Sequence, residues 1–91
     1  MAAVSVMVAI YRDSTYDNRF KSIYFTELDD HGRDSEIGRA MKGEQVWGGF
    51  LSRAKIEEAR GVVNRIVQRL NDGEKMSEED IDHELQPYKA S

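Results

Sequence analysis

The sequence predicts a small α+β domain in which a small antiparallel sheet packs against one long helix. Near the N-terminus, apolar residues alternate with a period of two, as in a strand that buries one face. Between residues 52 and 71, apolar residues instead recur at helical spacing, as in a helix with one core-facing side. A chain of 91 residues is expected to form a single domain, 1–91, with a small core.

The first two expected strands form a hairpin. In residues 3–11, one face carries only β-branched side chains, which favour a strand facing the core: Val4, Val6, Val8 and Ile10. Residues 13–18 have the composition of a turn, and residues 19–28 form the second strand. The two strands most simply pair antiparallel.

The second strand is apolar on both faces. Phe20, Tyr24 and Leu28 share one face, whereas Ile23 and Phe25 share the other. Both faces of the hairpin are therefore expected to be covered, and the pattern does not say which face the long helix covers.

The middle of the chain is expected to contain a polar loop, a short helix and a segment that is either a strand or a packed loop. These are residues 29–34, 36–42 and 44–50. An isolated hairpin is only marginally stable in water. Either residues 44–50 add a third strand, or a second chain pairs with an exposed edge, so a homodimer is left open.

The long helix is expected over residues 52–71. Its apolar residues fall within roughly 140° of arc on a helical wheel, which is the width of a core-facing stripe. They are Ile56, Ala59, Val62, Val63, Ile66, Val67 and Leu70. Ser52 is the expected N-cap, and Asn71, Asp72 and Gly73 supply the C-terminal stop.

A short C-terminal helix is expected over residues 77–86. Ser77 is a suitable N-cap, Asp80 occupies the third helical position, and Met76 and Ile81 are spaced for a hydrophobic staple. The helix is expected to end near residue 86 because Pro87 disfavours helical backbone in the residue before it.

Composition excludes several function classes. The chain has no cysteine, so neither a disulfide nor a thiolate metal site is expected. No apolar run approaches the roughly 20 residues of a membrane span, and the N-terminus lacks the charged start of a signal peptide, so a cytoplasmic protein without membrane contact is expected. The net charge of −4 argues mildly against general nucleic-acid binding.

No residue pattern indicates catalysis. The chain has no cysteine nucleophile and no serine in a nucleophile-elbow motif, so we expect no enzyme activity and no catalytic residues. His31 lies among acidic residues, but their spacing does not match a calcium loop, and His83 is expected on an exposed helix face. We therefore expect no metal and no cofactor.

The candidate partner-binding residues are aromatic, basic or acidic. Large aromatic residues on irregular backbone are common interface anchors, although burial of the only tryptophan is favoured. The aromatic and neighbouring basic candidates are Tyr16, Trp47, Phe50 and Arg53. The acidic candidates come from a block of seven acids between residues 72 and 84, and they are Glu78, Glu79, Asp80 and Asp82.

These features favour a non-catalytic protein–protein interaction module: a small acidic inhibitor, adaptor or accessory subunit. One specific form is an inhibitor, of the kind that mobile elements encode, that blocks the basic surface of a nucleic-acid-binding protein. The acidic block also has a simpler interpretation, as a solvated helix face that folds back toward Arg65 and Arg69.

Two alternatives belong to other classes. A small nucleic-acid-binding regulator would use the basic residues of the hairpin turn and the long helix, among them Arg12, Arg19 and Lys21. A small-molecule-binding domain would place its site at the residue 47–53 turn, where glycines precede a helix start with basic residues.

Overall fold

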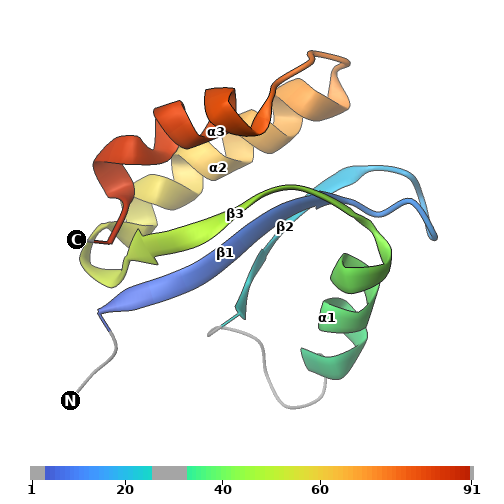
Figure 1. The fold of residues 1–91 in the computed structure, drawn as a ribbon, viewed down its shortest axis with the longest axis horizontal. Helices are drawn as coiled ribbons and strands as arrows, with labels where there is room; N and C mark the ends of the chain where they lie inside the picture. Colours follow the sequence, from blue (N-terminus) through green and yellow to red (C-terminus); the bar gives the residue numbers. More distant parts are fainter. Residues whose placement is uncertain (1–3, 26–32, 91) are drawn as a thin grey trace.

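The computed structural model describes residues 4–25 and 33–90, and within the latter range the side chains of residues 33–36 are not described. It confirms the α+β fold. The sheet has three strands. Figure 1 shows α2 and α3 on one face of this sheet and α1 on the other. The strands are β1 (Ser5–Arg12), β2 (Phe20–Tyr24) and β3 (Glu44–Ser52), and the helices are α1 (Arg33–Lys42), α2 (Ile56–Asn71) and α3 (Glu78–Leu85).

The sheet has the order β2-β1-β3, and both pairings are antiparallel. The hairpin of β1 and β2 is confirmed, with Arg12 opposite Phe20. Residues 44–50 are a strand, which extends to Ser52, so this segment supplies the third strand from within the chain. The second expected strand has its described part at Phe20–Tyr24, and the expected positions 26–28 lie outside the described residues.

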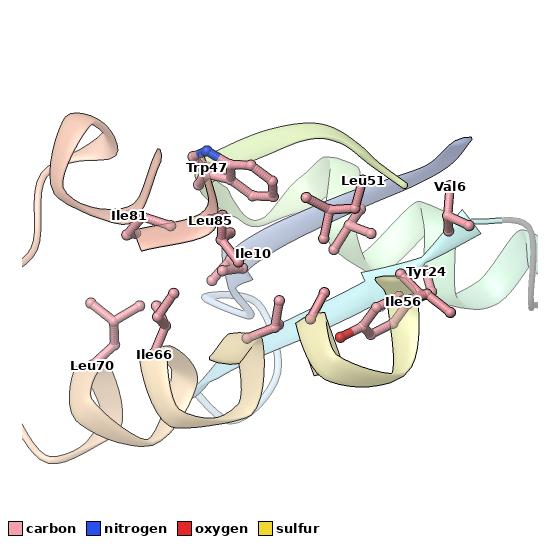
Figure 2. Close-up of a cluster of buried hydrophobic side chains, with 13 residues drawn as sticks. Val6, Ile10, Tyr24, Trp47, Leu51, Ile56, Ile66, Leu70, Ile81 and Leu85 are labelled. Carbon is pink, nitrogen blue, oxygen red and sulfur yellow. The ribbon is translucent and has the colours of Figure 1, made fainter. Parts of the chain in front are cut away.

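Both faces of the sheet are covered, as the apolar pattern of β2 predicts. On the α2 and α3 side, Val6, Val8 and Ile10 are at most 1% exposed and pack with the apolar stripe of α2 (Figure 2). On the α1 side, Ala9, Tyr11 and Ile23 form a second, smaller cluster. The even residues of β1 therefore face the larger core, because successive strand side chains point to opposite faces.

The start of the long helix is the main correction to the expected elements. Ser52 makes no side-chain capping hydrogen bond, because it is the last residue of β3 and pairs with Ser5. A 3₁₀ turn, Arg53–Lys55, separates the strand from α2, which begins at Ile56. The end is as expected: α2 ends at Asn71, and Gly73 adopts a φ of 99°, in the left-handed region that glycine favours.

The two short helices differ in how well their starts are predicted. For α3, Ser77 and Asp80 form the expected reciprocal capping box, with hydrogen bonds of 3.0 and 3.1 Å, and a 3₁₀ turn over Gln86–Tyr88 follows the helix. For α1, the helix begins at Arg33, before the expected residue 36, so residues 33 and 34 are helical. His31 and residues 29–32 of the expected loop lie outside the described residues.

Candidate functional site

Trp47 is a core residue. Its side chain is 1% exposed, and its indole Nε1–H donates to Asp82 Oδ1 at 3.1 Å, which ties β3 to α3. The indole lies over Gly49, where an added Cβ would come within 2.8 Å of the ring. The favoured burial is therefore confirmed, and the indole offers no surface to a partner.

Phe50 and Tyr16 are exposed but lie at opposite ends of the sheet. Phe50 is 57% exposed and pairs with Met7 near the start of β1. Tyr16 is 73% exposed in the turn that follows the end of β1. Arg53 is exposed beside the Phe50 end, where its backbone N–H donates to the carbonyl of Val4. Because β1 runs the length of the sheet, these candidates do not form one continuous surface.

Four acids of the 72–84 block make contacts within the molecule. Arg69 binds Glu74 and Glu84, with N–O distances of 2.8 Å, so the expected fold-back onto this arginine is confirmed. Asp80 caps α3 and Asp82 accepts from Trp47. The solvated-face interpretation therefore accounts for more than half of the block.

Two acids of α3, Glu78 and Glu79, remain outside these contacts. Glu78 and Glu79 are exposed and make no ion pair with another described residue. Together with Asp82, His83 and Gln86 they line an open depression on the helix. His83 is exposed, as expected.

Asp82 connects this surface to the C-terminal residues. Its Oδ1 also accepts from Lys89 Nζ at 2.6 Å. The hydrogen bond from Lys89, with that from Trp47, lowers the pKa of Asp82 below its ordinary value and keeps the side chain ionised. A basic side chain is thus already bound at the edge of the acidic surface.

The hairpin turn contains a polar cluster that sequence analysis missed. Asp13 is fully buried, and its Oδ2 accepts from Lys21 Nζ at 2.9 Å and from Arg39 Nη2 at 2.8 Å. Lys21 also binds Asp17 at 3.1 Å, and both cations lie against the Tyr16 ring. The only sequence signal is an aspartate next to an apolar strand, because Arg39 is 26 residues away in the chain.

This cluster weakens the case for nucleic-acid binding at the hairpin turn. Lys21 and Arg39 are bound to Asp13, and Arg12 is bound to Glu44 at 2.6 Å. The hydrogen bond from Lys21 lowers the pKa of Asp13 despite the opposing effect of burial, and Arg39 lowers it further. The carboxylate therefore stays charged and neutralises cations that a phosphate backbone would need.

The structure also bears on the remaining alternatives. Residues 47–52 are part of β3 and not a turn, so the glycines do not form a loop in front of a helix N-terminus. Within the described residues, no group of three or more histidine or acidic side chains is arranged to hold a metal ion. None of the described helices has the length and apolar composition needed to cross a lipid bilayer.

No protein-family model, curated protein or solved structure matches this chain.

Proposed function

We propose that this protein is a non-catalytic interaction module whose α3 surface binds a basic surface of another protein. We define the acidic α3 surface as Glu78, Glu79 and Asp82. The observation that carries the proposal is the state of Glu78 and Glu79, which are exposed without an ionic partner among the described residues, whereas four neighbouring acids are engaged in intramolecular contacts.

The position of these residues supports an external partner. Glu78 and Glu79 lie in the first turn of α3, where the helix dipole stabilises negative charge. The acidic α3 surface is held in place by the same helix, because Ile81 and Leu85 of α3 are fully buried in the core. A fixed cluster of like charges speeds association with an oppositely charged surface and selects against acidic partners.

The expected partner class follows from this chemistry. A protein with a basic groove or patch fits the acidic α3 surface, and nucleic-acid-binding proteins are a common source of such surfaces. An inhibitor of the kind that mobile elements encode would act by occupying that groove.

The test is a charge reversal with a matched control. Glu78→Lys/Glu79→Lys is compared with Glu57→Lys/Glu58→Lys, because both pairs are exposed acids in the first turn of a helix. Tagged proteins capture partners from a lysate of the source organism with and without nuclease, at about 50 mM and about 300 mM salt. We expect the α3 reversal to reduce recovery of a stoichiometric protein at least about tenfold, and the α2 reversal to change it less than about twofold.

Three results would count against this function. Equal recovery with both reversals would show that the acidic α3 surface is not used. Recovery that does not respond to salt would exclude an electrostatic interface. Recovery that disappears with nuclease would indicate that the protein binds nucleic acid. A gel shift at low salt would then measure that binding directly.

A further inference from the structure

We propose that the outer edge of β3 binds an extended basic segment of the partner as an added antiparallel strand. This inference rests on the proposed function and identifies the form of the partner that the acidic α3 surface receives. Lys89 and Ala90 of this chain occupy one end of the outer β3 edge and show that the edge pairs with an extended segment.

The C-terminal residues already act as a short added strand. Lys89 forms an antiparallel bridge with Leu51, and the Ala90 N–H donates to the Phe50 carbonyl at 3.2 Å. Lys55 Nζ holds the preceding turn through the Pro87 carbonyl at 3.0 Å. These contacts show that the outer side of β3 is accessible to main-chain pairing.

Most of this edge has no backbone partner among the described residues. β3 is the last strand in the order β2-β1-β3, so its ladder to β1 uses only one side. The C-terminal residues pair only at Phe50 and Leu51, which leaves the outer side from Glu44 to Gly49. A strand that follows the direction of Lys89 and Ala90 would run antiparallel to β3 toward Glu44. Open edges of this kind bind extended peptides through main-chain hydrogen bonds.

The opposite edge of the sheet is less suited to this role. At the start of β2, the Asn71 side chain both accepts from the Phe20 N–H and donates to the Phe20 carbonyl, at 2.8 and 3.0 Å. α2 therefore occupies that edge with a side-chain amide, and β2 is only five residues long. β3 has nine residues and lies next to the acidic helix.

The charge of the bound segment follows from Lys89. Its ammonium group binds Asp82 while its backbone pairs with β3, so one residue contacts both the strand edge and the acidic α3 surface. Glu78 and Glu79 line the same depression as Asp82. A guest strand with lysine or arginine at alternate positions would direct one row of cations toward these carboxylates, because strand side chains alternate in direction.

Lys89 and Ala90 would then compete with the partner's strand for the outer edge of β3. Lys89→Ala removes the ammonium group from Asp82 and weakens the competing strand without touching the core. Asp82→Asn removes the charge but keeps an oxygen that can accept from Trp47, so the two substitutions separate competition from recognition.

The probe is a capped ten-residue peptide of alternating lysine and threonine. Its controls are the same peptide with glutamate for lysine, and a lysine peptide with alternate backbone nitrogens methylated, which keeps its charge but cannot form a full ladder. Binding is followed on the ¹⁵N-labelled full chain by NMR. We expect amide shifts in β3 and α3 and not in β2, and binding about two- to fivefold tighter for Lys89→Ala. Adding Asp82→Asn to that variant should weaken binding about threefold or more.

The outcomes separate this inference from the proposed function. Equal binding of the methylated peptide, or shifts confined to α3, would overturn strand addition while leaving an acidic docking surface. Failure of the lysine peptide to bind either the wild type or Lys89→Ala would overturn the inference outright. The proposed function would fail separately, if Glu78→Lys/Glu79→Lys left partner recovery unchanged.

Discussion

At the scale of single residues, two buried side chains each join segments that are distant in sequence. Asp13 is the only charged side chain among the described residues that is fully buried, and its contacts with Lys21 and Arg39 join the hairpin turn to α1. Trp47 has the same role on the other face, where its indole joins β3 to Asp82 of α3. Both contacts connect residues distant in sequence, so neither could be read from local patterns.

Gly49 is required by the position of Trp47. An added Cβ would lie 2.8 Å from the indole ring, and the ring cannot move freely because it is 1% exposed. Gly49→Ala should therefore destabilise the protein by about 1–3 kcal/mol through overpacking. Urea unfolding followed by tryptophan fluorescence measures this change.

Gly61 supplies the matched control. Its added Cβ would meet only Arg65 Nη1 at 3.8 Å, and the residue lies in the middle of α2. Gly61→Ala should stabilise the protein by about 0.5–1 kcal/mol, because alanine loses less backbone entropy in a helix. Equal effects of the two substitutions would contradict the assigned contact between Gly49 and Trp47.

At the scale of elements, the capping serines show where sequence rules hold. Ser77 precedes a helix whose chain arrives in extended conformation, and its capping box forms. Ser52 has similar extended dihedrals, but its backbone is engaged in β3 and a 3₁₀ turn follows. Pairing with β1 therefore prevailed over the local preference of serine for an N-cap.

The difference between the two serines is measurable. Ser77→Ala should lower the free energy of unfolding by about 1 kcal/mol, since it leaves the Asp80 N–H without its capping acceptor. Ser52→Ala should lower it by less than about 0.5 kcal/mol, because no capping hydrogen bond is lost. Chemical denaturation of both variants provides the comparison, and a larger effect at Ser52 would contradict the observed start of α2.

At the scale of the whole molecule, acidic side chains stabilise the fold as well as shaping its surface. Asp13 and Asp82 have lowered pKa values through hydrogen bonds from cationic side chains, and that of Asp80 is lowered chiefly by the backbone N–H of Ser77. Near pH 4 the unfolded chain therefore binds more protons than the folded chain, and stability falls as the pH falls.

The lowered pKa values of these carboxyl groups predict that acid destabilises the protein and that Asp13 is one source of this effect. Stability should be constant above about pH 5 and should decline as the pH falls below about 4, as the lowered carboxyl groups are protonated. Asp13→Asn should be less stable at neutral pH and should show a shallower decline. Urea unfolding between about pH 6 and about pH 2.5 tests this, with Asp80→Asn as a surface comparison. Parallel profiles for the wild type and Asp13→Asn would exclude Asp13 as a source.

The residue pattern alone predicts the fold class, the hairpin, which residues of a strand share a face, the C-terminal end of α2 and the capping box that starts α3. These features follow from side-chain periodicity and from capping residues that act over one helical turn or one strand pair. It also indicated an acidic C-terminal block.

The contacts that these residues make depend on how the whole chain folds. Contacts between residues distant in the chain determine which face of the sheet α2 covers and that residues 44–52 form a strand. They also determine the pairing of Asp13 with Arg39 and the intramolecular contacts of four acids. Such contacts form because side chains from distant segments pack together in the core, so the residue pattern within one segment does not predict them. The same packing left Glu78, Glu79 and the outer edge of β3 as the surfaces on which the proposed interactions rest.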